Sequence, residues 1–349
     1  MGDELATRIA AATSEDDKYA LIKGLRPPFS DELLAVLANA LADQRRVLIS
    51  PGWYDDRDSV ANAARIALEC AGERIEPVVA AKLDHDDRTC RDLALGLLAA
   101  LPALAPATLD AILRLAGDPR HAYKAGLALA GKLDARPLLD FPETRLAGLI
   151  ATPGLEPAWL VELFGDANHE VRLRALHRVK DIAPPAHELA PAIVPLLADP
   201  DPVISAAAIR AIAPLRTDDA SVTAAMFAAI RDHGRARELL DALAKRPPAQ
   251  LVPFVPEMLR WLRVGDTTVA VVLGALGSAA PENAAVALGD ELVRRQDGHF
   301  WLVRALEQLG AAALPALPSI DRAARELADG DARTAVAQLA ARLHALAGT

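Results

Sequence analysis

The chain has 349 residues, a formal net charge of −9 and a hydrophobic content of 52%, with aromatic residues at only 4%. The acidic balance argues against a protein whose main task is to hold nucleic acid or an anionic membrane surface, because both tasks need a cationic face. The apolar residues are mainly Ala, Leu, Val and Ile, which favours helices. A chain of this length forms either two or three domains or a repeat array.

The N-terminus carries acidic residues where a secretory signal would be basic, and no stretch reaches about 18 uninterrupted apolar residues. The two cysteines, Cys70 and Cys90, have no metal-ligand spacing, so we expect free thiols in a reducing compartment. These features predict a cytoplasmic protein with no membrane span, no metal site and no cofactor.

Residues 1–29 are expected to form an N-terminal helical cap. Two short helices are divided at Thr13-Ser14, where Ser14 followed by Asp17 is typical of a capping box. The Pro27-Pro28 pair ends this section. Ser30 then opens a helix with an apolar stripe of leucines.

Acidic turns recur along the rest of the chain at nearly constant spacing. Seven of the eight gaps between them are 31 to 34 residues long, and the remaining gap is 48. Each turn is followed by a helix rich in Ala, Leu and Val, and most are preceded by another amphipathic helix. The segment 134–155 fills the long gap and is predicted to be an irregular insertion with one short additional helix. The turn aspartates are Asp55, Asp86, Asp118, Asp166, Asp199, Asp232, Asp266, Asp297 and Asp329.

The most regular copy of this pattern is the stretch 196–215, LLADPDPVISAAAIRAIAPL. Two prolines in alternate positions stop the first helix, and Pro202 suits the first turn of the next one. Asp201 or Asp199 can cap its free amides. The second helix presents an apolar face through Ile204, Ala208, Ile212 and Leu215. A hairpin this small cannot bury that face alone, so it must stack on neighbouring hairpins.

The Asp-Pro-Asp-Pro turn, the Glu170-Val171-Arg172 triplet and the Leu-Gly pairs at 276–277 and 309–310 resemble bacterial HEAT repeats. These include the short variety found in bilin-lyase-like proteins. The resemblance covers roughly residues 30–346 and implies an all-α α-solenoid, a right-handed superhelix of about nine HEAT-like hairpins with a concave groove. Residues 30–349 then form the repeat array. The arginine typical of the pattern stands at Arg172, but Ser205 and Lys124 occupy corresponding positions, which weakens the expectation of a full Arg/Asp ladder between repeats.

The longest irregular piece is predicted at 43–58, inside the first repeat. It contains Arg45, Arg46, Trp53 and Tyr54, and aromatic and arginine side chains are the usual anchors of a binding surface. The alternative is that its apolar residues merely cover the N-terminal end of the core.

A second candidate surface lies on the helix 168–181. With apolar residues such as Val171 inward, helical spacing places one exposed stripe on the opposite side, and Arg210 falls one repeat further on. The stripe contains Arg174, His177, Arg178 and Asp181. If the second helices line the groove, this stripe is a cationic patch. A solvated charged face explains it equally well.

Other side chains carry weaker signals. Histidines recur beside the turn aspartates, but repeats about 10 Å apart are too far apart to share one ion, so we interpret them as polar turn residues. Trp301 is expected in the core or at a groove edge, and Trp261, which lies between arginines, is expected to be half exposed. No phosphate loop, nucleophile elbow or HExxH motif is present.

The leading functional hypothesis is therefore a non-catalytic scaffold that binds a protein or peptide in the concave groove or through the 43–58 segment. One alternative is an enzyme built on HEAT-like repeats, of the DNA glycosylase or bilin lyase type. Another is self-assembly through exposed apolar ends. The sequence leaves the oligomeric state open.

Overall fold

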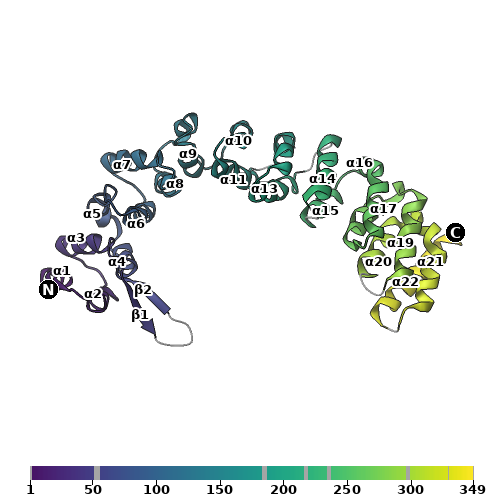
Figure 1. Cartoon of the computed structure of the whole chain (residues 1–349), viewed down its shortest axis with the longest axis horizontal. Helices are drawn as coiled ribbons and strands as arrows, with labels where there is room; N and C mark the ends of the chain where they lie inside the picture. Colours follow the sequence, from purple (N-terminus) through teal and green to yellow (C-terminus); the bar gives the residue numbers. More distant parts are fainter. Residues whose placement is uncertain are drawn as a thin grey trace. The chain divides into compact units, whose positions relative to one another are not determined.

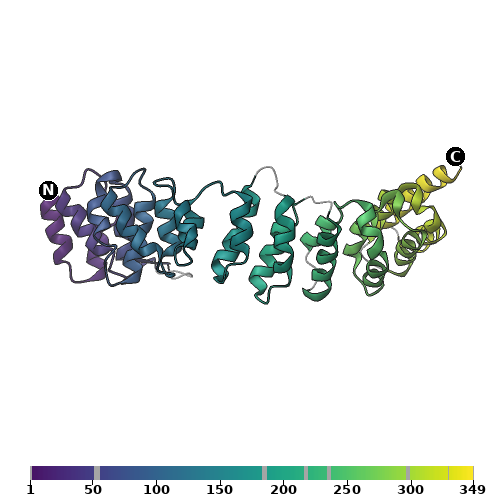
Figure 2. The same ribbon diagram turned by 90° about the horizontal axis from the view of Figure 1, so that it is seen from above.

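A computed structural model describes residues 2–50, 56–182, 187–215, 219–233, 237–295, 299–328 and 330–348. The chain divides into two compact units, Met1–Leu155 and Glu156–Thr349. Each unit consists of helix pairs stacked side by side (Figures 1 and 2). No helix among the described residues combines the length and the apolar character needed to cross a membrane.

In unit 1 the two helices of each pair belong to two rows (Figure 1). The first-helix row contains α1 (Gly2–Ala11), α3 (Asp31–Ala40), α5 (Glu76–Ala80) and α7 (Pro106–Ala116), with the 3-10 turn η1 (Gly72–Ile75) before α5. The second-helix row contains α2 (Glu15–Ile22), α4 (Val60–Glu69), α6 (Arg88–Ala99) and α8 (Ala122–Leu129). Each helix packs on the next member of its own row.

Side-chain caps set where these helices begin. Ser14 accepts a hydrogen bond from the Asp17 amide at 3.1 Å, as the sequence predicts. Asp87 accepts one from the Cys90 amide at 2.8 Å and starts α6. Each cap satisfies an amide that the first turn of a helix leaves free. Because α1 and α2 pack on α3 and α4, residues 1–29 form a first pair of the same kind as those that follow; their role as a cap remains a prediction.

The segment 134–155 contains a shortened pair. The 3-10 turn η2 (Arg136–Asp140) takes the place of a first helix, and α9 (Arg145–Ala151) packs on both η2 and α8. Gly126 of α8 permits this packing, because a Cβ atom there would lie 2.7 Å from the Ala147 carbonyl oxygen. The additional helix therefore continues the stacking within unit 1, and the boundary between the two units follows at Leu155.

In unit 2 the first-helix row is more broken, with several short 3-10 turns. It contains α10 (Pro157–Phe164), η4 (His187–Leu189), α12 (Ala190–Ile193), η5 (Val194–Ala198), α14 (Ala220–His233), α16 (Pro248–Leu251), η6 (Val252–Phe254), α17 (Val255–Arg263), α19 (Glu282–Arg294), η9 (Gly310–Ala316) and α21 (Leu317–Glu326). The second-helix row contains α11 (His169–Arg178), η3 (Val179–Asp181), α13 (Pro202–Ile212), α15 (Arg237–Leu243), η7 (Thr267–Val269), α18 (Ala270–Gly274), η8 (Gly277–Ala279), α20 (His299–Leu309) and α22 (Asp331–Ala347).

Helix α13 matches the pair predicted for 196–215. Pro202 is its first residue, and Asp201 accepts a hydrogen bond from the Val203 amide at 2.9 Å. Ile204, Ala208 and Ile212 are fully buried. The turn prediction is confirmed because proline and aspartate act locally, independently of what packs against the hairpin.

Trp261 corrects a prediction. It lies in α17, and its side chain is buried, 7% exposed, whereas its arginine neighbours suggested a half-exposed ring. The reason is an aromatic stack within the first-helix row. The Phe227 ring of α14 lies 5.8 Å from the Trp261 ring and 4.2 Å from the Phe254 ring. Such stacking fills the core between α14 and α17.

Candidate functional site

The described parts of the predicted irregular segment 43–58 instead form two paired strands, which we call the β-hairpin. Strand β1 (Arg46–Ser50) pairs antiparallel with β2 (Asp56–Ser59), so that Arg46 lies opposite Ser59. The prediction of an irregular loop was wrong because the charged sequence of β2 has low strand propensity and gains its structure from pairing with β1. Val47 of β1 is buried. The predicted contact residues Trp53 and Tyr54 lie outside the described residues.

Arg45 holds the base of this hairpin to the first helix pair. Its Nη2 and Nε atoms contact the Asp43 carboxylate at 2.6 and 2.8 Å, and its Nη1 donates to the Thr13 carbonyl at 3.0 Å. Lys18 Nζ lies 3.2 Å from the same carboxylate. Arg45, and to a lesser degree Lys18, lower the pKa of Asp43 to about 2. Arg45 is thus engaged within the chain, whereas Arg46 is exposed at the start of β1.

The second predicted surface lies on α11 and α13, which are neighbours in the second-helix row of unit 2. His177 and Arg210 are exposed, and Arg174 and Arg178 are half-buried. Partial desolvation lowers the pKa of His177, and the positive charges of Arg174 and Arg210 lower it further. The structure therefore brings these three side chains into one electropositive neighbourhood.

Carboxylates on α11 and η3 partly neutralise that neighbourhood. Arg174 Nε lies 2.8 Å from Glu170 Oε1, and Arg178 Nε lies 3.6 Å from Asp181 Oδ2. No carboxylate among the described residues pairs with Arg210. The stripe is a modest cationic surface whose unneutralised charge lies at Arg210, because the lowered pKa of His177 disfavours a charged ring there.

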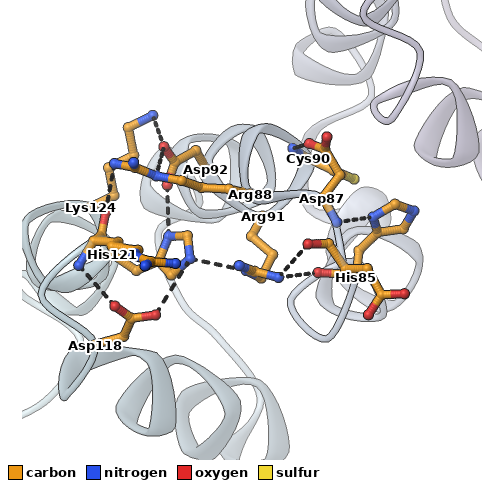
Figure 3. Close-up of polar contacts among 11 residues, drawn as sticks. His85, Asp87, Arg88, Cys90, Arg91, Asp92, Asp118, His121 and Lys124 are labelled. Carbon is orange, nitrogen blue, oxygen red and sulfur yellow. Dashed lines mark hydrogen bonds and ion pairs between the residues drawn. The ribbon is translucent and has the colours of Figure 1, made fainter.

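A polar cluster joins α6 and α8 in unit 1 (Figure 3). His121 is fully buried. Its Nδ1 atom lies 2.8 Å from Asp92 Oδ1. Its Nε2 atom accepts a hydrogen bond from Arg91 Nε at 3.0 Å. Lys124 Nζ lies 3.3 Å from Asp92 Oδ2. Since a guanidinium can only donate, Nε2 must be the acceptor and the His121 proton resides on Nδ1. The ring is neutral and donates to Asp92.

The Asp92–His121 pair has the composition of a catalytic dyad but lacks its geometry. In a dyad the second imidazole nitrogen faces a nucleophile or a substrate. Here the guanidinium of Arg91 occupies that nitrogen, and no solvent reaches the ring. The cluster therefore fixes one repeat to the next.

Arg91 and Arg172 connect repeats in the same way. Arg91 donates to the carbonyls of His85 and Asp86 in the turn before its own helix, the latter at 3.1 Å, and reaches His121 of the next repeat. Arg172 donates to the Asp166 carbonyl at 2.9 Å and contacts Asp199 of the next repeat at 3.5 Å. The arginine of one repeat thus reaches a histidine of the next repeat at the first junction and an aspartate at the second. The sequence pattern predicts a polar turn residue at His121 and does not indicate this contact between repeats.

A third surface, which the sequence analysis did not single out, lies on α20. Phe300 is 65% exposed, and its ring packs edge-on to the half-buried Trp301 with 5.0 Å between ring centroids. Arg304, one turn further on, is exposed. We call Phe300, Trp301 and Arg304 the α20 ridge.

A depression lies on each side of the α20 ridge. The first, about 580 Å³, lies toward α22, and its lining includes Phe300, Val303, Arg304 and two alanines of α22, Ala332 and Ala335. These small side chains leave space that larger ones would fill. The second, about 170 Å³, lies toward α15 and α18 and is lined by Trp301, Arg304, Ala305, Gln308, Asp241 and Val271. Arg304 borders both.

Helical periodicity could have located this ridge. Leu302, Ala305 and Leu309 are buried, so Phe300 and Arg304 must lie on the opposite side of an 11-residue helix. Within this helix, the sequence prediction concerned Trp301 only. The depressions depend on the sizes of side chains on α18 and α22, far along the chain, and this information is not local.

No family model matches the sequence, and no curated protein matches it. Solved structures that match include importin beta, at 14% identity over 98% of this chain and 50% of that one, with a TM-score of 0.45. YibA from E. coli matches at 14% identity over 95% of this chain and 97% of that one, with a TM-score of 0.41. A chain from a structure concerning cadherin and beta-catenin matches at 14% identity over 98% of this chain and 91% of that one, with a TM-score of 0.40.

This chain spans about half the length of the importin beta chain that it matches. At these identities and TM-scores the comparisons carry no inference about binding or activity. The stacked helix pairs themselves establish the fold. Each unit is an α-solenoid of stacked helix pairs, to which unit 1 adds the two-stranded sheet β1–β2.

Proposed function

We propose that this chain is a scaffold that binds a protein or peptide partner on the second-helix row of unit 2. The observation that supports the proposal best is the α20 ridge, where a largely exposed phenylalanine lies beside a tryptophan and an arginine. Aromatic side chains and arginine dominate binding energy at protein interfaces. An exposed phenylalanine also has an unfavourable contact with water that a partner would remove.

The α11 and α13 stripe belongs to the same row and extends the proposed surface. The row runs through α11, α13, α15, α18, α20 and α22, each packed on the next. We propose that Arg210, together with Arg174 and Arg178, contributes electrostatic steering, because exposed charges affect association rates more than affinity. His177 adds a polar contact beside them. A contribution of Arg46, Trp53 and Tyr54 remains a separate proposal for unit 1.

Photo-crosslinking with a matched control tests the proposal. Benzoylphenylalanine replaces Phe300 in one variant of the full chain and Phe141 in another, and both are expressed in cells of the source organism. Phe141 is also a largely exposed phenylalanine, at 56%, but it lies next to η2 in unit 1. We expect a discrete crosslinked protein at position 300 only. Equal crosslinking at both positions, or none at position 300, would contradict the proposal.

A further inference from the structure

The charge of Arg304 is available to a partner. Its guanidinium has no carboxylate within 4 Å among the described residues, although three acidic side chains line the two depressions. Glu307 is already paired with Arg342. Asp241 takes part in an interaction of its own. Asp331 is the first residue of α22, where the helix dipole offsets part of its charge.

Apolar side chains border this cation on both sides. Toward α22 lie Phe300, Val303 and Ala335; toward α18 lie Trp301 and Val271, in a depression that Asp241 and Gln308 also line. A volume of about 150 Å³ holds a benzene-sized group. The smaller depression, at about 170 Å³, therefore accommodates one apolar side chain, and the larger, at about 580 Å³, accommodates a bulky one or several.

We infer that the α20 ridge binds a peptide segment of a partner protein in which one carboxylate side chain is flanked by apolar side chains. This inference rests on the proposed function and gives its partner a chemistry. The carboxylate pairs with the Arg304 guanidinium, which can form two parallel hydrogen bonds to it. The flanking apolar groups fill the two depressions and exclude water around the ion pair, which strengthens the pair.

Nucleic acid fits this site poorly. A phosphate backbone carries regularly spaced negative charges and needs several cations along its path. Among the described residues, Arg304 is the one arginine that lines the two depressions, and no lysine lines them, so a phosphate backbone would find a single such cation there. A single carboxylate on an otherwise apolar segment meets the cation alone.

A peptide-display selection on the full-length chain tests the inference. Random 12-residue peptides are selected on the wild type and on the Arg304→Glu, Phe300→Ser and Phe141→Ser variants. These side chains are all exposed, so circular dichroism should confirm unchanged folding. We expect wild-type peptides to contain Asp or Glu between apolar residues. Their affinity should fall at least tenfold for Arg304→Glu and for Phe300→Ser, and it should be unchanged for Phe141→Ser.

The outcomes separate the inference from the proposed function. Peptides that need Phe300 but lack an acidic residue and bind Arg304→Glu equally well would overturn the inference and leave the proposed function intact. A selection in which no peptide depends on Phe300 would overturn both. Light scattering of the wild type and Phe300→Ser tests whether a second copy of the chain binds the ridge instead. A dimer that forms in the wild type and is lost in the variant would overturn the inference.

Discussion

Single buried residues at the junctions between repeats decide how the polar groups of the turns are satisfied. At the α6–α8 junction the neutral His121 ring serves as donor to Asp92 and as acceptor for Arg91 at the same time. Neither aspartate nor lysine could do both, because one only accepts and the other only donates. The histidine therefore has a specific structural reason to be there.

Replacing that histidine should destabilise unit 1. In His121→Leu, Arg91 Nε loses its acceptor and the half-buried Asp92 loses its Nδ1 donor. Leaving such partly buried groups unpaired costs roughly 1–3 kcal/mol. Urea denaturation measures this loss. The control is His177→Leu on α11, an exposed position where we expect a change below about 0.5 kcal/mol; similar losses in the two variants would refute the role assigned to His121.

Asp43 should make the stability of the chain depend on pH in the acid range. Its pKa of about 2 in the folded state lies below the value of about 3.9 expected for an unfolded chain. A lowered pKa means that the unfolded state binds the proton more readily. The contribution of Asp43 is therefore complete above about pH 5, declines below about pH 4 and is gone below about pH 2. Because the Asp43 side chain is only 12% exposed, we expect its charge to contribute about 1–2 kcal/mol to the free energy of unfolding near neutral pH.

The measurement is the free energy of unfolding of Asp43→Asn and of the wild type between pH 7 and pH 3. The difference should be constant near neutrality and should shrink toward pH 3. Asp134 provides the control, because Arg136 lowers its pKa to about 2 as well but the pair is exposed to solvent. Surface pairs contribute little, so Asp134→Asn should leave the profile unchanged. A pH-independent loss in Asp43→Asn would show that its carboxylate charge is not the cause.

At the scale of whole elements, the sequence predicts those features, such as helix caps and buried helix faces, that depend on residues close together in the chain. Caps at Ser14 and Asp201 and the buried face of α13 follow from side chains within a few positions of one another. The β-hairpin and the shortened pair at η2 and α9 do not, because each depends on contact with a separate element. Helical spacing predicts that Arg174 and His177 share a face of α11, whereas placing Arg210 beside them requires the repeat period as well; a binding role for these residues stays a prediction. It missed the depressions beside the α20 ridge, which three other helices help to form.

The close approach of α8 and α9 can be tested at Gly126. Alanine normally favours a helix over glycine by about 1 kcal/mol. At Gly126, however, the added Cβ would lie 2.7 Å from both the Ala147 carbonyl oxygen and Ile150 Cβ. We expect Gly126→Ala to destabilise the chain by roughly 1–3 kcal/mol, as overpacking does.

Gly96 in the middle of α6 is the matched control. A Cβ there meets nothing within 4 Å, so Gly96→Ala should stabilise the chain by about 0.5–1 kcal/mol. Thermal and urea denaturation measure both variants. Stabilisation by both substitutions would mean that α9 does not pack on α8 as closely as the structure indicates.

At the scale of the whole molecule, stability is close to a sum over adjacent pairs. Helix α13 packs on α11, α15 and the adjoining first-helix segments, all within unit 2. In such an array a local defect weakens its neighbours and leaves distant repeats unaffected. The two units should therefore respond separately to a defect placed in one of them.

Proline at position 208 provides that defect. Ala208 lies in the middle of α13 and is fully buried. Proline there removes a helix hydrogen bond and clashes with the preceding turn, at a cost of about 3 kcal/mol or more.

Cys90 reports on the other unit. It is fully buried in α6 of unit 1, burial raises the pKa of its thiol, and the side chain is shielded until that unit opens. Thiol labelling in a Cys70→Ser background, which removes the exposed cysteine, then reports on unit 1 alone. In Ala208→Pro we expect part of the helical signal to be lost at lower urea than in the wild type, with the urea dependence of Cys90 labelling unchanged. Val203→Ala, at an exposed position of the same helix, should alter neither measurement. Labelling of Cys90 at the same reduced urea as the loss of helix would mean that the two units unfold as one.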